Sequence, residues 1–197
     1  MPKNNYLVAG DPVGELAIAE TMATELEDYI THDDLYRMIV ARTPEGDQRL
    51  QMTGGDLLSR LHRLQVVRNQ FTPDQQARLD IVQKAVPETI YSLRTRFHER
   101  LQREMKARLD ALNWYLSDLT TDRSRARTEY PFEIRNRERI EAIVQELGTD
   151  LSADLSQNLS KIDQRIRTAT AVSGFIWDER LKPAYPQSPY WYLYVTA

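Results

Sequence analysis

Hydrophobic residues recur at steps of three and four along most of this chain, which predicts a succession of amphipathic helices. The first such pattern begins behind Asp11 and Pro12, an acidic N-cap followed by proline at the first helical position, and extends to about Ile30. A second stripe is expected to begin at a cap on Asp56 and to end near Asn69. The chain therefore reads first as a helical protein.

The longest stripe runs through the middle of the chain. Thr72 and Gln75 form a capping-box pattern around a proline at the first helical position. No stop signal follows until Thr120, and the apolar positions recur at close to 3.6 residues. They are Ile90, Leu93, Phe97, Leu101, Met105, Leu109, Leu112, Leu116 and Leu119. We predict one helix over about 73–119, roughly 65–70 Å long, with a kink at Pro87.

Two shorter stripes follow a polar connection over residues 120–131. They predict helices over about 132–147 and 151–169, separated by a glycine stop at Gly148. Because both are long enough to lie antiparallel to the central helix, we expect an antiparallel bundle.

Residues 36–53 break the helical pattern. A short apolar run, Met38 to Ala41, is followed by strong turn chemistry around Pro44 and Gly46, and then by alternating apolar and polar positions. This favours a β-hairpin with strands over about 36–42 and 48–53. The alternative for residues 32–42 is a helix capped by Thr31.

The C-terminal segment, residues 174–197, is rich in aromatic residues and proline. Its prolines exclude a regular helix, and residues 190–195 have high β-propensity. We expect the segment to dock on the body of the protein, with a third strand beside the hairpin as one arrangement. The alternative is an exposed partner-binding patch made by Tyr190, Trp191, Tyr192 and Tyr194.

Together these patterns predict a mainly α fold. It is an elongated antiparallel helical bundle built on one long kinked helix (about 73–119), with a small β-hairpin (about 36–53) and a possible C-terminal strand. We expect one domain over residues 1–197, with an acidic N-terminal helix and hairpin in 1–56, the bundle in 57–173 and the docking tail in 174–197.

Composition narrows the classes of function. The absence of cysteine excludes disulfide scaffolds, Cys-ligated metals and cysteine nucleophiles. No signal peptide and no apolar run of membrane-spanning length are seen, so we expect a cytoplasmic protein without a membrane partner. The net charge of −3 conceals an asymmetry, because residues 1–56 carry −7 and residues 94–139 carry +4.

The basic segment contains a group of candidate phosphate-binding residues. They are Arg123, Arg125, Arg127, Arg135, Arg137 and Arg139. Since arginine bonds phosphate through a planar fork, an arginine-rich tip of a helical hairpin predicts nucleic-acid binding as one alternative. The other interpretation is a solvated face with weak ion pairs such as Glu133 to Arg137.

Metal chemistry has little support. No two of the three histidines are expected to share a helix face, and the sequence contains no His-Glu-x-x-His motif. All-helical nucleotide pyrophosphohydrolases hold magnesium with Glu-x-x-Glu followed by Glu-x-x-Asp. Here the halves, at Glu138 and Glu141 and at Glu25 and Asp28, occur in reverse order and far apart. We predict no catalytic residue, no metal and no cofactor, and keep a metal-dependent phosphohydrolase as the second alternative.

The predicted function is a non-catalytic helical interaction or assembly protein, forming a homodimer or binding another helical protein. The physical reason is the length of the central helix, which exceeds what a protein of this size readily covers. Nucleic-acid binding through the arginine-rich tip is the first alternative.

Overall fold

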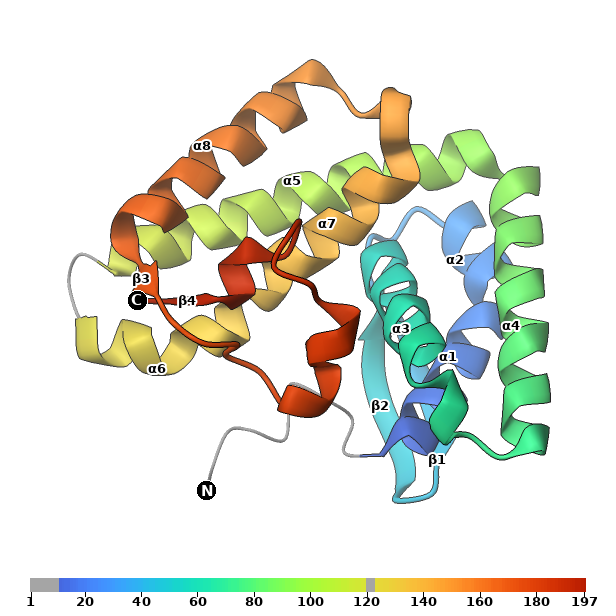
Figure 1. The fold of residues 1–197 in the computed structure, drawn as a ribbon. Helices are drawn as coiled ribbons and strands as arrows, with labels where there is room; N and C mark the ends of the chain where they lie inside the picture. The colour runs from blue at the N-terminus through green and yellow to red at the C-terminus, as the bar shows by residue number, and fades with distance from the viewer. Residues whose placement is uncertain (1–10, 120–122) are drawn as a thin grey trace. The chain divides into compact units, whose positions relative to one another are not determined.

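The computed structural model describes residues 11–119 and 123–197, apart from the side chains of residues 123, 125 and 126 (Figure 1). The chain is mainly α-helical, as predicted, with a two-stranded hairpin and a second short two-stranded sheet among the described residues. It forms two compact units, Met1–Glu104 and Met105–Ala197. No helix in the described ranges combines the length and hydrophobicity needed to span a bilayer.

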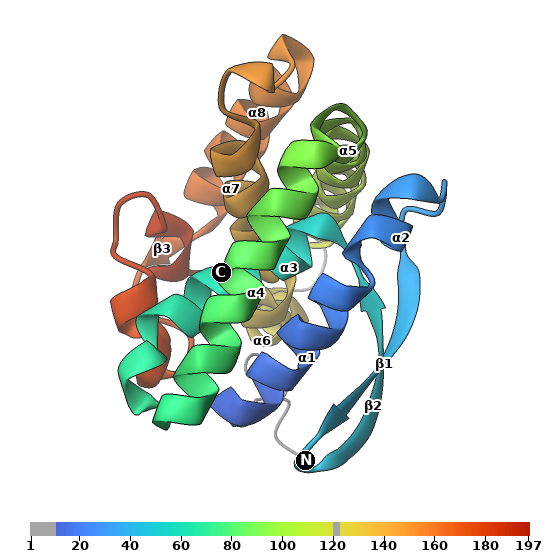
Figure 2. The same ribbon diagram turned by 90° about the vertical axis from the view of Figure 1, so that its right-hand side faces the viewer.

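The first unit is built around an N-terminal helix. Its elements are α1 (Pro12–Thr24), α2 (Leu26–Thr31), β1 (Arg37–Thr43), β2 (Gly46–Met52), α3 (Gly54–Val66), the 3-10 turn η2 (Arg68–Gln70), α4 (Pro73–Ser92) and the first turns of α5 (Arg94–Asp118). Figure 2 shows α1 between the hairpin on one side and α4 on the other. The side chains of Leu16, Ala19 and Met22 are fully buried there.

The helix predicted from Pro12 to Ile30 is divided at Glu25. Asp11 caps α1 as expected, accepting a hydrogen bond from the backbone N–H of Val13 at 3.2 Å. Thr21 and Thr24 each donate a side-chain hydrogen bond to the carbonyl four residues before. Such bonds back to the helix backbone bend helices, which accounts for the break just after Thr24.

The hairpin is confirmed over the alternative helix. β1 and β2 pair antiparallel from Arg37 opposite Met52 to Thr43 opposite Gly46. The turn therefore has two residues, Pro44 and Glu45, and Gly46 adopts a φ of +118°, which a residue with a side chain rarely takes. The turn chemistry in the sequence thus marks the right place, with β2 beginning two residues earlier than predicted.

The cap of α3 is Thr53, and the prediction of Asp56 as the cap was wrong. The side chain of Thr53 accepts the N–H of Asp56 at 3.2 Å, so the helix begins at Gly54. The capping box of Thr72 and Gln75 at the start of α4 is confirmed.

The single helix predicted over 73–119 is divided at Leu93 into α4 and α5. The division was expected as a kink at Pro87, and it occurs six residues later. Pro87 lies inside α4, whereas Leu93 has φ −122° and ψ 26°. Figure 1 shows α4 and α5 meeting at a corner there. The two helices pack on different partners, since α4 lies along α1 while Phe97 and Leu101 of α5 pack against Gly54. One straight axis cannot satisfy both contacts.

The second unit continues from the remainder of α5. Its other elements are α6 (Arg123–Glu133), α7 (Arg135–Leu147), η3 (Gly148–Asp150), α8 (Ala153–Ala169), β3 (Ala171–Val172), η4 (Glu179–Ala184), η5 (Trp191–Leu193) and β4 (Val195–Thr196). Gly148 ends α7 with a φ of +50°, as predicted. Arg108 on α5 donates to Asn136 on α7 at 2.9 Å, and Arg165 on α8 donates to Asn113 and Ser117 on α5.

The prediction of a polar connection over 120–131 is wrong from Arg123 onwards, because that part of the chain forms helix α6. Residues 120–122 lie outside the described residues. Tertiary packing stabilises this helix against its polar composition. Tyr130 is fully buried and donates its hydroxyl to the carbonyl of Tyr192 at 2.8 Å.

The tail docks through its aromatic rings, and the strand that it forms does not join the hairpin. β4 pairs with β3 in a separate sheet, Ala171 opposite Thr196 and Val172 opposite Val195. Residues 191–193 are a 3-10 turn, not the predicted strand. The ring of Tyr185 makes edge contacts with Trp177 and Tyr190, at 5.3 and 4.9 Å between centroids, and these contacts override local β-propensity.

Candidate functional site

The outer face of the hairpin carries an exposed apolar column. Tyr36, Met38 and Val40 alternate along β1 and its approach, and they are 46%, 48% and 58% exposed. The intervening residues Ile39 and Ala41 face the core and are buried. The column therefore lies on the solvent side of a sheet whose other side is packed, where polar residues are the rule for a free surface.

Polar side chains border this column on the neighbouring strand. Met38 pairs with Gln51 and Val40 with Arg49, so these side chains share the outer face. At the end of the column nearest the turn, Arg42 and Asp47 form an exposed ion pair at 3.5 Å. We call the set Tyr36, Met38, Val40, Arg42, Arg49 and Gln51 the hairpin face.

The segment leading into the hairpin is held by arginines of α5. Arg100 donates to the carbonyls of Ile30, at 3.2 Å, and Asp34, at 2.5 Å. Arg103 donates to the carboxylate of Asp33 at 2.9 Å, and this hydrogen bond lowers the pKa of Asp33. The hairpin is thereby fixed at its base.

A buried carboxylate holds the loop between β2 and α3. Glu104, fully buried, accepts the Thr53 hydroxyl at 2.7 Å and the Gly55 N–H at 2.9 Å. Tyr29 accepts the Gly54 N–H through its hydroxyl at 3.1 Å, and burial raises its pKa to about 12. The start of α3 is thus filled by the chain's own groups, and we assign it a structural role.

The six candidate arginines do not form one row of phosphate-binding groups among the described side chains. Arg137 is buried, bound to both carboxylate oxygens of Asp163 at 2.7 and 3.0 Å and to Glu141 at 2.9 Å. Arg135 stacks on the ring of Phe132 at 5.2 Å, and Arg139 is half-buried. Arg127 is exposed on α6, while the side chains of Arg123 and Arg125 lie outside the described residues.

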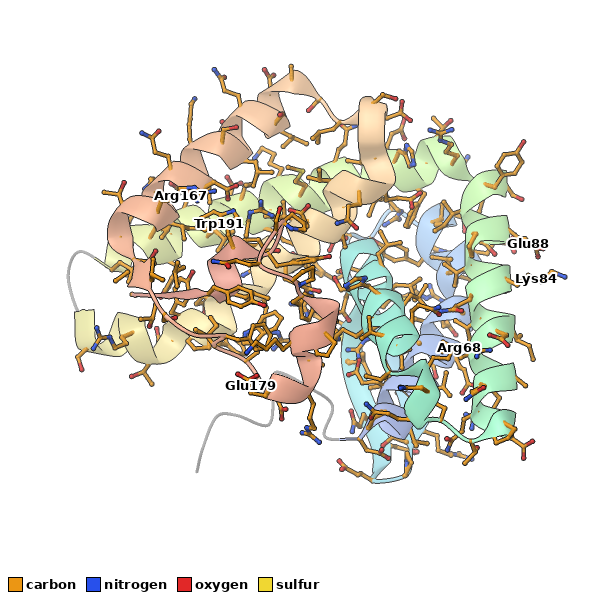
Figure 3. All side chains as sticks on the ribbon, viewed as in Figure 1. Arg68, Lys84, Glu88, Arg167, Glu179 and Trp191 are labelled. Carbon is orange, nitrogen blue, oxygen red and sulfur yellow. The ribbon has the colours of Figure 1, made fainter. Side chains whose placement is uncertain are left out.

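The aromatic tail is largely an internal anchor. Tyr190 and Tyr192 are buried, and the guanidinium of Arg137 lies 4.6 Å from the ring centre of Tyr192. Trp191 is half-buried beneath Arg167, whose guanidinium is 3.6 Å from its ring centre (Figure 3). Tyr194 donates to the carbonyl of Tyr185 at 2.7 Å. These contacts favour the docking interpretation over a partner-binding patch.

The acidic pairs considered for magnesium have partners of their own. Arg37 binds both Glu25 and Asp28, at 2.7 and 2.9 Å. Glu138 accepts the hydroxyl of Tyr185 at 2.8 Å, and Glu141 is bound by Arg137. In the part of the chain that the structure describes, no group of three or more histidine or acidic side chains has metal-binding geometry.

No protein-family model, curated protein or solved structure matches this chain.

Proposed function

We propose that the protein is a non-catalytic interaction protein that self-associates through the hairpin face. The supporting observation is the exposed apolar column of Tyr36, Met38 and Val40 with a polar border. An apolar patch rimmed by polar groups is typical of protein interaction sites. The site is fixed to a packed sheet and needs no folding on binding.

The hairpin face is self-complementary, which supports a second copy of this chain as the proposed partner. A two-fold axis that reverses the direction of β1 places Met38 of one copy over Val40 of the other. The same operation sets Tyr36 against Arg42, a cation–π arrangement, and Arg49 against Gln51. No like charges meet in this arrangement, and every residue pair occurs twice.

The apolar stripe of the central helix lends little support to the interface that we expected there from its length. The stripe residues Phe97, Leu101, Met105, Leu109, Leu112, Leu116 and Leu119 are buried. The exposed apolar side chains of the hairpin therefore support the proposed dimer better than this stripe does.

The size of the patch sets the expected strength. Stable interfaces bury about 800 Å² per partner, whereas this column consists of three half-exposed side chains. We therefore expect a weak dimer, with Kd on the order of micromolar or above.

Sedimentation velocity on the full chain tests the proposal. We expect a shift from monomer to dimer between about 10 µM and 1 mM, the range for an interface of this size. Val40→Lys should abolish it, because it puts a charge at the centre of the interface, and Met38→Gln should weaken it. Ile81→Lys, an equally drastic change of an exposed aliphatic residue on α4, should leave it unchanged. A wild-type monomer throughout, or equal loss in both lysine variants, would overturn the proposal.

The other two functions have weaker support. Nucleic-acid binding needs several arginines facing solvent together, and burial removes Arg137 from such a set. A metal-dependent phosphohydrolase needs acidic groups free to bind magnesium, and the four candidate carboxylates accept hydrogen bonds or ion pairs from Arg37, Arg137 and Tyr185.

A further inference from the structure

Trp114 lies on the solvent side of α5, in the part of the helix that belongs to the second unit. Its side chain is 75% exposed, whereas Leu112 and Leu116 on the opposite face of the helix are buried. Tryptophan is highly buried on average in folded proteins. A single exposed apolar residue is nevertheless common on a surface, so the neighbours of this indole decide what it can bind.

Two carboxylates bracket the indole along the helix. Asp110 is four residues before Trp114 and Asp118 four residues after it, and residues at this spacing are neighbours on one helix face. Asp110 forms an exposed ion pair with Lys106 at 3.1 Å, a weak contact that another cation can displace. The exposed carboxylate of Asp118 has no hydrogen bond or ion pair with another described residue. Negative charge therefore lies one turn away on both sides of the indole.

Small residues beside the indole leave room for a partner to approach. Ala111 is exposed and Ala107 is half-buried, three and seven residues before Trp114. The three residues form a second apolar stripe on α5, apart from the buried one. Apolar positions at i, i+4 and i+7 are the pattern by which one amphipathic helix contacts another.

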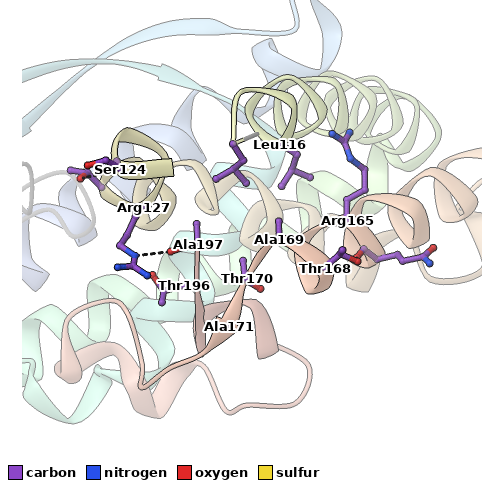
Figure 4. A pocket seen from close by; sticks show the side chains of 13 residues that line it. Leu116, Ser124, Arg127, Arg165, Thr168, Ala169, Thr170, Ala171, Thr196 and Ala197 are labelled. Atoms are coloured by element: carbon purple, nitrogen blue, oxygen red, sulfur yellow. Dashed lines mark hydrogen bonds between the residues drawn. The ribbon is translucent and has the colours of Figure 1, made fainter. Parts of the chain in front are cut away.

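The neighbouring side of α5 is occupied by groups of the same unit. Arg165 on α8 donates to the amide oxygen of Asn113 and to the hydroxyl of Ser117. It lines a pocket between α6, α8 and the β3–β4 sheet, where Arg127 donates to the main-chain oxygen of Ala197 at 2.7 Å (Figure 4). Both arginines of this pocket are therefore bound within the chain, and neither stacks on the exposed indole.

The second unit uses cation–aromatic contacts in its interior. The guanidinium of Arg167 lies 3.6 Å from the ring centre of Trp191, and that of Arg137 lies 4.6 Å from the ring centre of Tyr192. Tryptophan is the aromatic side chain that attracts a cation most strongly. Trp114 offers the same ring to solvent, and in the described part of the chain no cation lies on it.

We propose that Asp110, Trp114 and Asp118 bind a lysine or arginine side chain on a basic amphipathic helix of another protein. The cation lies on the face of the indole, and the two carboxylates contact it from either side. The apolar residues of the partner helix pack on Ala107 and Ala111. We call these five residues the Trp114 site. It belongs to the second unit and the hairpin face to the first, so each is tested independently of the other.

Titration of the full chain with a designed amphipathic helical peptide of leucine and lysine tests the proposal. The peptide contains no tryptophan, so a blue shift of the fluorescence emission reports burial of an indole of the protein. We expect binding with Kd on the order of 10–100 µM, because the site is much smaller than a stable interface. A peptide of the same length with glutamate in place of lysine should not bind, since its charge is repelled by both carboxylates.

Variants at exposed positions locate the site, with affinities measured by calorimetry. Trp114→Ala should weaken binding of the leucine–lysine peptide about tenfold or more and remove the emission shift, since tryptophan is a frequent hot spot of interfaces. Asp118→Asn should weaken binding about threefold, as expected for an exposed charge pair. Tyr91→Ala, an exposed aromatic residue on α4, and Asp154→Asn, an exposed carboxylate on α8, should leave affinity unchanged.

The proposal fails if the leucine–lysine peptide does not bind the wild-type protein below about 1 mM, or if the leucine–glutamate peptide binds as tightly. It also fails if Tyr91→Ala weakens binding as much as Trp114→Ala does. If Trp114→Ala leaves peptide binding unchanged but abolishes dimerisation in sedimentation velocity, a second copy of this chain covers the indole and the basic helix is the wrong partner.

Discussion

The carboxylate of Glu104 accepts the hydroxyl hydrogen of Thr53 at 2.7 Å, although the two residues are 51 positions apart. The same carboxylate accepts the N–H of Gly55, so it lies at the start of α3 where the helix dipole favours a negative charge. A residue of α5 thus completes the cap of α3. The contact joins the hairpin, α3 and α5 of the first unit through one buried group.

Removal of this carboxylate should destabilise the protein. We expect Glu104→Ala to lower the free energy of unfolding by about 2–4 kcal/mol, because two buried donors lose an acceptor. Glu104→Gln keeps one acceptor oxygen and should lose less. Urea unfolding followed by circular dichroism measures both. Glu99→Ala, at an exposed position of the same helix, should change the free energy by no more than about 0.5 kcal/mol, and an equal effect at both sites would contradict the assignment.

Gly54 should not tolerate a side chain. A Cβ there would lie 2.7 Å from Cδ2 of Leu101 and 3.0 Å from the ring of Phe97, both buried. We expect Gly54→Ala to cost about 1–3 kcal/mol through overpacking. In Gly174→Ala, the new Cβ has no atom within 4 Å, so stability should change little. Thermal unfolding of the two variants separates steric conflict from the general effect of replacing glycine.

Arg137 should be essential for the stability of the second unit. Arg137→Leu leaves Asp163 and Glu141 without their cation, and breaking a buried pair typically costs about 3–5 kcal/mol. Arg137→Lys keeps the charge but not the two-point contact with Asp163, so its loss should be smaller.

The double variant Arg137→Leu with Asp163→Leu provides the check on this explanation. It should recover part of the lost stability, because the second substitution removes the unpaired charge. Arg180→Ala breaks an exposed pair with Asp178 and should cost under about 1 kcal/mol. If the double variant is as unstable as the sum of its single changes, the ion pair is not the cause.

Acid should weaken the first unit through Glu15. Burial acts to raise its pKa, but the positive charges of Arg60 and Arg63 outweigh burial and hold the pKa below its usual 4.5. Because the pKa is lowered in the folded state, the ionised carboxylate stabilises the protein at any pH above its usual pKa. This stabilisation is lost as the pH falls through the pKa that the group has in the folded protein. Thermal midpoints measured from pH 6 to pH 3 should therefore fall less steeply for Glu15→Gln than for wild type.

The control for this pH dependence is Glu27→Gln, at an exposed position of α2. Its thermal midpoint should fall between pH 6 and pH 3 as steeply as that of the wild type. If the thermal midpoints of Glu15→Gln and wild type fell equally steeply as the pH is lowered, another group would control acid unfolding.

Local signals predicted the boundaries that depend on neighbouring residues. Thr72 and Gln75 begin α4, Gly148 ends α7, and the turn before Gly46 joins two strands. Each of these features arises from backbone hydrogen bonds or φ angles within a few positions, so the residue types alone carry the information.

The candidate sites were only partly visible beforehand. The apolar run from Met38 to Ala41 places hydrophobic residues on both faces of β1. The sequence therefore does not show that Ile39 and Ala41 are the residues buried in the core, or that Met38 and Val40 are exposed. The arginine group is apparent in the sequence, but Arg137 and Arg127 have opposite environments, since Arg137 is buried against Asp163 and Arg127 is exposed on α6.

Hydrophobic periodicity and capping residues were enough to establish a mainly α protein with one hairpin, because they act over a few positions along the chain. The break at Leu93, the helical α6 and the separate β3–β4 sheet were decided by packing. In each case groups far apart in the chain, such as Gly54 with Leu101 or Tyr130 with Tyr192, had to be buried together. Burial depends on the whole fold, and it overrode the local preference of the segment.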